Sequence, residues 1–253
     1  MRLGFIGAGN MASALARGIG EPALVADIDA RKADALAAAL GGEAVGSNAE
    51  LAERAEAVVL CHKPKQLEEV AAEVAGHTDV VVSILAATGT GALASAYPGA
   101  AIYRFIPNMP VEVRRGVLCY VRGPGAAEGP EAEILELMGR TGTVIGLDPE
   151  PLIEPAMALM SCGPAFMALV AEAFAEAGAA HGLDPAAAMR MVVETMGGTA
   201  GWLAEHGYDG PELRARVATP GGATERGLER LEAEGLHELA RATVDAVVEK
   251  AGA

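Results

Sequence analysis

The sequence predicts an α/β protein in two parts, a doubly wound parallel sheet followed by a region made only of helices. Short apolar runs alternate with helical patterns through the first 148 residues, which is typical of a sheet covered by helices on both faces. The pattern changes near Asp148 and Pro149, after which no strand is expected. We therefore place one domain at residues 1–148 and a second at residues 149–253.

The strands of the first domain are expected at short, uniformly apolar runs, because strands buried on both faces carry few polar residues. Helices are expected between the runs, and the first of them at Met11–Ile19. The strand runs are Arg2–Ile6, Leu24–Ala26, Ala57–Leu60, Val80–Leu85, Ala101–Phe105, Val117–Val121 and Thr143–Ile145. The other helical stretches are Arg31–Leu40, Gln66–Ala75 and Glu131–Gly139.

The second domain is expected to contain four helical segments rich in Ala, Met, Leu and Glu. Several begin at or just after a proline, a residue favoured in the first turn of a helix. The segments are Pro149–Met160, Pro164–His181, Pro185–Glu205 and Glu225–Lys250. Helices with so many small apolar residues need another surface to cover them, so we expect them to pack against a second subunit.

Composition excludes several classes of partner. The formal net charge is −15, which argues against nucleic acid and against anionic membranes. We expect no apolar run long enough to span a bilayer, and the first residues lack the pattern of a signal peptide. The cysteines, Cys61, Cys119 and Cys162, form no CxxC pair, and no HExxH motif occurs, so neither a disulfide framework nor a metal site is expected. A cytoplasmic protein is the resulting expectation.

A glycine-rich segment opens the first helix. The run from Gly7 to Ala12 has the form G-x-G-x-x-A directly after the first strand. The first glycine permits a tight turn, the second lets a pyrophosphate approach the backbone, and the alanine lets the helix pack closely. Alone, such a run can be a tight strand–helix turn without a ligand. Its position favours dinucleotide binding, with contacts from Gly7, Ala8, Gly9, Asn10 and Met11.

An acidic residue ends the second strand. Asp27 follows Gly7 by twenty residues, where a carboxylate can hold the ribose 2′-hydroxyl of a dinucleotide. A carboxylate there repels a 2′-phosphate, and Ile28 follows it in place of an arginine. The cofactor is therefore expected to be NADH or NADPH, with NADH favoured by Asp27, although Arg31 and Lys32 lie close by in the sequence.

Five segments together resemble the pyrroline-5-carboxylate reductase family, in its order and at its spacing. The most specific is the last, which is similar to the family's Ser-Pro-Gly-Gly-Thr/Ala-Thr…Leu-Glu-x-x-Gly signature. The segments are Gly4–Met11, Lys63–Pro64, Arg104–Pro110, Ser161–Phe166, and Thr219–Thr224 with Leu231–Gly235. The resemblance covers essentially the whole chain.

This resemblance implies an N-terminal Rossmann domain and a C-terminal helical dimerisation domain. It implies a homodimer, which assembles further into a decamer in some members, and an active site between the cofactor domain and helices of the dimer. The expected activity is reduction of the C=N bond of a small cyclic imine carboxylate, above all 1-pyrroline-5-carboxylate to proline, by hydride from NAD(P)H. Hydride transfer is the chemistry of the cofactor, so the protein must position the imine and supply charge.

The segment around residue 224 can meet both demands of such a substrate. The backbone N–H groups of Gly221, Gly222 and Ala223 precede a helix start, which is a favourable place for a carboxylate. The hydroxyl of Thr224 can bond the ring nitrogen, so Thr224 is the candidate catalytic residue. The alternative is an ordinary capped helix start, which Thr and a glycine pair often form.

Further candidates lie at the carboxyl ends of strands, the edge where doubly wound sheets bind ligands. Lys63, Pro64, Ser83 and Ala86 are expected to line the cofactor. Asn108 is expected on both the cofactor and the substrate side. The alternatives are a solvated surface lysine at Lys63, buried strand-end residues at Ser83 and Ala86, and a turn residue at Asn108.

Four positions depart from the family pattern and bear on the substrate. Ile106 replaces a methionine, Cys162 a serine and Phe166 a tyrosine. Glu194, a further candidate for substrate binding, stands where the family often has glutamine. These changes leave open a related reductase for another cyclic imine.

Two other classes are weighed against the reductase. A β-hydroxyacid dehydrogenase uses a lysine on its interdomain helix, whereas the only lysines here are Lys32, Lys63, Lys65 and Lys250. A non-catalytic dinucleotide-binding protein would have no need of the 220–224 segment.

Overall fold

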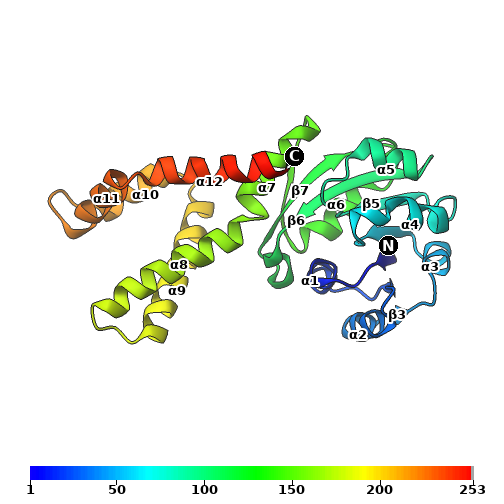
Figure 1. Cartoon of the computed structure of the whole chain (residues 1–253), viewed down its shortest axis with the longest axis horizontal. Coiled ribbons are helices and arrows are strands. Elements are labelled where there is room, and N and C mark those ends of the chain that lie inside the picture. The colour runs from blue at the N-terminus through cyan, green and yellow to red at the C-terminus, as the bar shows by residue number, and fades with distance from the viewer. Residues whose placement is uncertain (252–253) are drawn as a thin grey trace. The chain divides into compact units, whose positions relative to one another are not determined.

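A central sheet of eight strands organises the first part of the chain (Figure 1). The computed structural model describes residues 1–251, which divide into one compact unit at residues 1–164 and another at residues 165–251. We refer to them as unit 1 and unit 2. The strand order in unit 1 is β3-β2-β1-β4-β5-β6-β7-β8. The chain reverses its direction of winding between β1 and β4, which is where doubly wound sheets bind their ligands.

The strands form where the apolar runs predict them, with small differences at their ends. An additional strand, β3, is only two residues long and too short to give a periodic signal. The strands are β1 (Leu3–Ile6), β2 (Leu24–Ala26), β3 (Glu43–Ala44), β4 (Ala57–Leu60), β5 (Val80–Ser83), β6 (Ala101–Pro107), β7 (Gly116–Arg122) and β8 (Gly142–Gly146).

The helices of unit 1 alternate with these strands, as predicted. They are α1 (Asn10–Ile19), α2 (Ala30–Leu40), α3 (Asn48–Arg54), α4 (Leu67–Val74), α5 (Thr90–Ala96), α6 (Glu131–Gly139) and α7 (Ile153–Met160). Short 3-10 helices occur at Pro64–Gln66, Met109–Val113 and Glu150–Leu152. The two faces of the sheet bury separate apolar clusters, one around Phe5 and Leu15 and the other around Leu60 and Leu93. The sheet edge that holds the site is thus fixed from both sides.

One pair of strands corrects the expectation of a wholly parallel sheet. Strands β6 and β7 run antiparallel, with Arg104 opposite Val121 and Ile106 opposite Cys119. The connection between them, residues 108–115, is a short 3-10 turn that ends at Arg114 in the left-handed conformation. Parallel strands need a long crossover, so this short link forces the antiparallel pairing.

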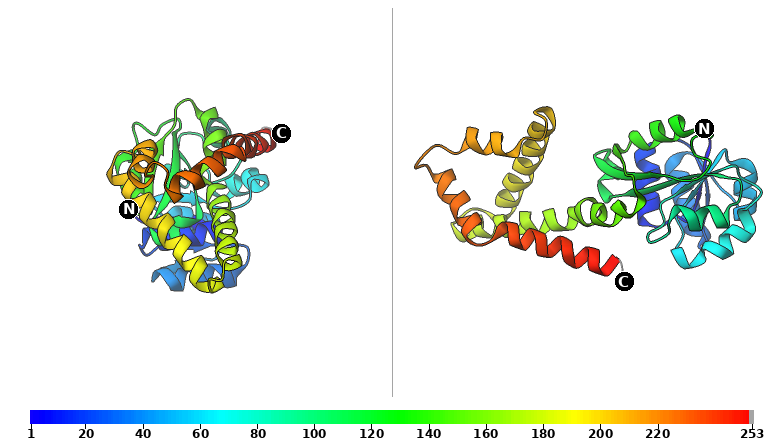
Figure 2. Two further views of the ribbon diagram at one scale, coloured as in Figure 1. Left: turned by 90° about the vertical axis from the view of Figure 1, so that its left-hand side faces the viewer. Right: turned by 90° about the horizontal axis from the view of Figure 1, so that it is seen from above.

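Unit 2 is entirely helical in the part of the chain that is described. Its helices are α8 (Gly163–Ala180), α9 (Pro185–Glu205), α10 (Gly210–Val217), α11 (Ala223–Ala233) and α12 (Leu236–Ala251), and α8 turns into α9 at residues 181–184 (Figure 2). The sequence patterns missed α10 and predicted 225–250 as one helix. Gly235, at φ 77°, breaks it into α11 and α12, because a left-handed residue cannot continue a helix.

The helices of unit 2 leave most of their apolar side chains exposed. Among the described residues of this unit the buried ones are Ala171, Ala175 and Ala188. Leu169 and Leu239 are about two-thirds exposed, and Phe174 is half exposed. Trp202, the only tryptophan of the chain, stacks on His206 at 3.9 Å between ring centroids, and Arg216 lies 5.6 Å above its ring.

One apolar stretch contradicts the expectation that none is long enough to span a membrane. Residues 150–180, which comprise the 3-10 turn at Glu150–Leu152, α7 and α8, make a stretch of 31 residues with mean hydropathy 1.6 in its most apolar window, which is sufficient by length and composition. A helix that packs against another protein surface passes the same test, so one such stretch is weak evidence for a membrane span.

Candidate active site

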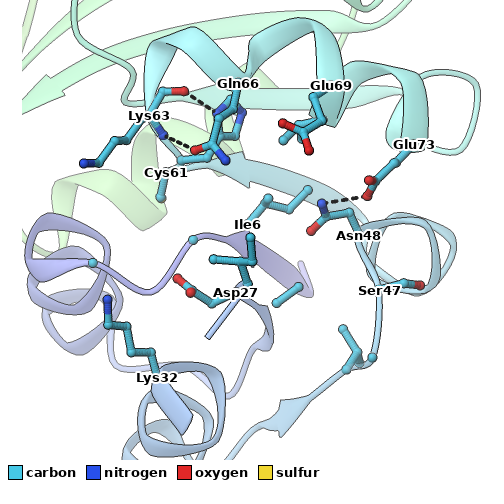
Figure 3. A pocket seen from close by; sticks show the side chains of 18 residues that line it. Ile6, Asp27, Lys32, Ser47, Asn48, Cys61, Lys63, Gln66, Glu69 and Glu73 are labelled. Atoms are coloured by element: carbon cyan, nitrogen blue, oxygen red, sulfur yellow. Dashed lines mark hydrogen bonds between the residues drawn. The ribbon is translucent and has the colours of Figure 1, made fainter. Parts of the chain in front are cut away.

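A cavity of about 510 Å³ opens at the carboxyl ends of β1, β2, β3 and β4, beside the reversal of the sheet (Figure 3). Its walls come from the loops that follow these strands and from α4. Of the predicted cofactor contacts, Gly7, Gly9, Asp27 and Lys63 line it. The structure thus brings the glycine-rich loop, the acid after β2 and the lysine after β4 to one place.

The two glycines of the loop meet different surroundings. Gly7 has φ 101°, and a Cβ atom there would lie 2.8 Å from the carbonyl carbon of Cys61. A Cβ atom on Gly9 would meet no atom within 4 Å. The first glycine is therefore required by the fold, whereas the second leaves open space beside the backbone.

The start of α1 suits an anion. Its N-cap is Gly9, no side chain caps the helix, and its first turn holds no acidic residue. The first backbone N–H groups of a helix lack partners within the helix and carry partial positive charge. These residues fit the pyrophosphate of a dinucleotide, which would lie against Gly9 and the start of α1.

Asp27 organises the loop as well as lining the cavity. One carboxylate oxygen accepts a hydrogen bond from the Ala8 N–H at 2.7 Å, and the other accepts one from the Asp29 N–H at 2.8 Å. Each carboxylate oxygen can accept more than one bond, so both can still receive ribose hydroxyls. Asn10 and Met11 lie in the first turn of α1, and neither lines the cavity.

Acidic groups outnumber basic ones around the cavity. Asp27, Glu69 and Glu73 line it together with Lys32 and Lys63. The Asn48 amide donates to the Glu73 carboxylate at 2.8 Å (Figure 3). No motif in the sequence points to Asn48, Glu69 or Glu73 as lining residues.

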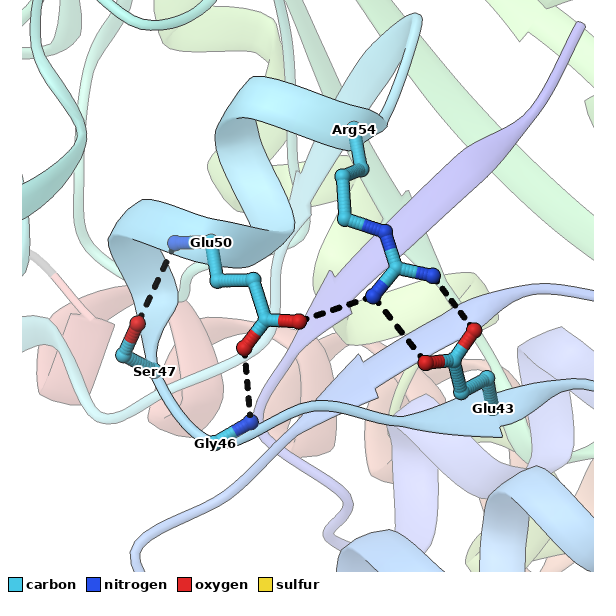
Figure 4. Close-up of polar contacts among 5 residues, drawn as sticks. All are labelled: Glu43, Gly46, Ser47, Glu50 and Arg54. Carbon is cyan, nitrogen blue, oxygen red and sulfur yellow. Dashed lines mark hydrogen bonds and ion pairs between the residues drawn. The ribbon is translucent and has the colours of Figure 1, made fainter.

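The loop after β3 could have been found by its capping signal. Ser47 and Glu50 have the S-x-x-E spacing, and the Glu50 N–H donates to the Ser47 hydroxyl at 3.1 Å. Glu50 in turn accepts from the Gly46 N–H at 3.3 Å, and Arg54 bridges Glu50 and Glu43 (Figure 4). This signature fixes the start of α3 and so the wall formed by residues 45–48.

Cys61 and His62 are not arranged for nucleophilic chemistry. Burial raises the pKa of the Cys61 thiol, so it stays protonated near neutral pH. Burial lowers the pKa of His62 below its ordinary value, against an opposing bond to the Lys63 carbonyl. The His62 Nε2 atom is buried and has no hydrogen-bond partner among residues 1–251.

Glu150, in the segment that follows β8, holds the loop after β5 in place. Glu150 accepts from the Thr90 N–H at 2.9 Å, from the Thr90 hydroxyl at 2.7 Å and from Arg104 at 2.5 Å. Burial acts to raise the pKa of Glu150, but these bonds outweigh it and hold that pKa below its ordinary value. Ser83 is fully buried and accepts from the Leu85 N–H, whereas Ala86 is exposed.

Asn108 bonds through both ends of its side-chain amide inside unit 1. It is 6% exposed, and its Nδ2 donates to the Met160 carbonyl at 2.9 Å. Its Oδ1 accepts from the Val117 N–H at 2.9 Å. Asn108 therefore joins the end of β6 to β7 and to the last residue of α7.

The segment before α11 forms a second glycine-rich helix start. Gly222 is the N-cap and contributes no side chain, and Gly221 has φ 71°. Thr224 is exposed in the first turn. The Gly221 N–H donates to the Glu225 carboxylate at 2.6 Å. Glu194 is exposed on α9, and no hydrogen bond joins its side chain to the 221–224 loop within residues 1–251.

Two family models match the chain. The one described as pyrroline-5-carboxylate reductase dimerisation matches residues 150–253, and the one described as NADP oxidoreductase coenzyme F420-dependent matches residues 2–87. Together they give the two parts an N-terminal nucleotide-binding sheet and a C-terminal helical dimerisation domain, as predicted.

Proteins named as pyrroline-5-carboxylate reductases match over nearly the whole length. Pyrroline-5-carboxylate reductase 3 of Macaca fascicularis is 32% identical, and the match covers 97% of this chain and 93% of that protein. The structure of a pyrroline-5-carboxylate reductase from Coxiella burnetii has a TM-score of 0.91 at 29% identity and covers 99% of this chain and 97% of that one. The Plasmodium falciparum pyrroline carboxylate reductase with NADP bound has a TM-score of 0.85 at 24% identity, with 99% and 97% covered.

Proposed function

The chain belongs to the pyrroline-5-carboxylate reductase family, and we infer from this membership that it reduces 1-pyrroline-5-carboxylate to proline with NAD(P)H. The observation that carries the inference is the 32% identity, over 97% of the chain, to a protein named as a pyrroline-5-carboxylate reductase, on a chain whose α1 start fits a dinucleotide. The reaction adds a hydride to the imine carbon and a proton to the ring nitrogen. The cofactor supplies the hydride, and the protein binds the carboxylate and places the C=N bond.

The decisive experiment is an NADH- and NADPH-oxidation assay with 1-pyrroline-5-carboxylate, other cyclic imines and β-keto acids. We expect the imine carboxylate to give the highest kcat/KM and the keto acids to give no turnover. A preference for a keto acid would favour a β-hydroxyacid dehydrogenase. Cofactor binding without turnover of any substrate would favour a non-catalytic protein.

We propose that NADH is preferred over NADPH. Asp27, Glu69 and Glu73 surround the cavity in which the adenosine ribose would lie, and carboxylates repel a 2′-phosphate. Lys32 on α2 and Lys63 also line the cavity and oppose this preference. Comparison of kcat/KM for the two cofactors tests the proposal, and a strong preference for NADPH would contradict it.

We propose that the 221–224 loop binds the substrate and that Thr224 is the catalytic residue. Gly221, Gly222 and Ala223 present backbone N–H groups at the start of an eleven-residue helix, which suits the substrate carboxylate. The exposed Thr224 hydroxyl can bond the ring nitrogen and pass a proton to it. We also propose that Glu194 contacts the substrate in the assembled enzyme.

We propose that the cofactor is contacted at the ends of β1, β2, β4 and β5. The pyrophosphate is held by Gly7, Ala8, Gly9, Asn10 and Met11, and the ribose is held by Asp27. Lys63 and Pro64 lie beyond them at the end of β4, and Ser83 and Ala86 at the end of β5. We propose that Asn108 contacts both cofactor and substrate, while the bonds of its amide to backbone groups fix its place at the end of β6.

We propose that unit 2 forms a homodimer, and that dimers assemble further as in some members of the family. The exposed Leu169, Phe174 and Leu239 support this, because apolar patches of this kind mark protein interfaces. We propose that the functional domains meet at residue 148, with cofactor binding in residues 1–148 and dimerisation in residues 149–253. Sedimentation at micromolar concentration should show at least a dimer, and a monomer would contradict the proposal.

We propose a cytoplasmic location. Cys61, Cys119 and Cys162 are all free thiols, which suits a reducing compartment. Subcellular fractionation tests this, and recovery in a membrane or secreted fraction would contradict it.

A further inference from the structure

The proposed substrate loop already holds a carboxylate that belongs to the protein. Glu225 is partly buried, and its Oε2 accepts a hydrogen bond from the Gly221 N–H at 2.6 Å. This N–H is one of the groups proposed to bind the substrate carboxylate. The same donor therefore serves an internal acid in the free chain.

The position of this acid sets α11 apart from the neighbouring helices. In α9 and α10 the caps are Asp184 and Asp209, which stand at the N-cap itself and bond to the first turn. In α11 the N-cap Gly222 has no side chain, and the acid reaches back from inside the helix. The donor can thus be freed by rotating one side chain, without unwinding the helix.

We propose that Glu225 is a specificity-determining residue, whose carboxylate occupies the Gly221 N–H until the carboxylate of the substrate displaces it. The inference rests on the proposed function of the 221–224 loop. Two carboxylates cannot share one donor at short distance without repulsion. The substrate must therefore bind a chain in which Glu225 has turned away. Its apparent affinity is the intrinsic affinity multiplied by the fraction of chains in that state.

An ordinary helix cap would give the same hydrogen bond but different kinetics. An acid that reaches back from the first turn stabilises a helix start, so removing it lowers stability under both interpretations. Only displacement by substrate predicts that removing Glu225 tightens binding of a carboxylated imine. It also predicts no change for an imine that lacks the carboxylate, because such a substrate leaves Glu225 in place.

The test uses the full-length protein and compares Glu225→Ala and Glu225→Gln with the native chain. The substrates are 1-pyrroline-5-carboxylate and 1-pyrroline, which differ by the carboxylate. We expect Glu225→Ala to lower KM for the carboxylated substrate roughly two- to fivefold, with kcat and the KM for 1-pyrroline unchanged. Glu225→Gln can still accept the bond without its charge, so its KM should fall less.

Glu229→Ala is the matched control, since Glu229 lies one turn further along α11 and is exposed beside Arg226. It removes the same charge without touching the loop, so both KM values should stay native. An unchanged or raised KM for 1-pyrroline-5-carboxylate in both Glu225 variants would overturn the inference. If Glu225→Ala fails to fold, Glu225→Gln still shows whether KM for 1-pyrroline-5-carboxylate falls or rises.

The same data separate this inference from the function on which it rests. If the native chain uses 1-pyrroline-5-carboxylate and 1-pyrroline with equal KM, the loop does not bind the carboxylate, and both proposals fall. If the native chain prefers the carboxylated substrate and the Glu225 variants keep that preference unchanged, only the role of Glu225 falls.

Discussion

Helices α1 and α11 start in the same way, but the two starts differ in the acid that bonds to them. Each helix has a glycine N-cap, Gly9 or Gly222, and neither glycine can cap with a side chain. The first turn of α1 has no acid, whereas that of α11 has Glu225 bonded to the Gly221 N–H. An internal carboxylate bonds the N–H just before each N-cap, Asp27 at Ala8 and Glu225 at Gly221, but Asp27 comes from the end of β2 and Glu225 from within α11. Similar backbone geometry can thus carry an internal acid that frames the helix start from outside or one that reaches back from the first turn.

The largest expected effect tests whether chemistry occurs at the α11 start. We expect Thr224→Ala to lower kcat by roughly 100-fold, because a general acid or base contributes at least that much. Its melting temperature should change little, since Thr224 is exposed. Steady-state kinetics and a thermal melt measure both. Thr243→Ala, at a half-buried position on α12, is the control, and unchanged turnover in Thr224→Ala would remove Thr224 from the mechanism.

The next effect tests the fold of the α1 start. Gly7→Ala places a methyl group 2.8 Å from the Cys61 carbonyl carbon at a φ of 101°. We expect the free energy of unfolding to fall by about 2 kcal/mol or more, from strain and overlap together. Gly41 has φ 66° and no atom within 4 Å of an added Cβ atom, so Gly41→Ala isolates the backbone strain. We expect it to lower the free energy of unfolding by about 1 kcal/mol. Equal losses in urea denaturation would show that Gly7 is not crowded.

A smaller effect tests whether the α1 start is open to a ligand. Gly9→Ala meets no protein atom within 4 Å, so stability should stay within about 0.5 kcal/mol of the native value. The methyl group would stand where the pyrophosphate approaches. We expect KM for NADH to rise about tenfold, equivalent to about 1.4 kcal/mol. A native KM would mean that the cofactor does not pass over Gly9.

The smallest effect uses a helix start that has no proposed ligand. Asp184→Ala removes the N-cap bond to the Ala187 N–H, 2.9 Å long, at the start of α9. We expect a loss of about 1 kcal/mol of stability, measured by urea denaturation, with KM unchanged for cofactor and imine. A change in either KM would show that capped helix starts also take part in binding, which would weaken the contrast between α1 and α11.

The sequence was sufficient for most of the strands of unit 1 and for the glycine-rich loop. Continuous apolar runs are a strong signal when both faces of a sheet are covered, as at Val58 and Val81. The two-residue strand β3 and the direction of β7 were missed, because a short strand has no periodicity and pairing direction depends on the connection. The break at Gly235 was missed for a related reason, since helix-favouring residues flank it on both sides.

The candidate site was predicted where a motif carries the chemistry and was missed where tertiary contacts do. Gly7, Gly9, Asp27 and Lys63 reach one cavity, as their places at strand ends predict. Nothing in the sequence indicated that Asn48 and Glu73 would meet there, because they come from different loops. The bonds from the two ends of the Asn108 amide to Val117 and Met160 are likewise a property of the packed chain.

The stacked Trp202 makes one half of the molecule optically distinct. It lies in unit 2 in contact with His206 and Arg216, and it is the only indole in the chain. Emission excited at the red edge of its absorption therefore follows the environment of the helical unit alone, while circular dichroism sums over both units. Loss of the two signals at different denaturant concentrations would reveal that the units melt separately.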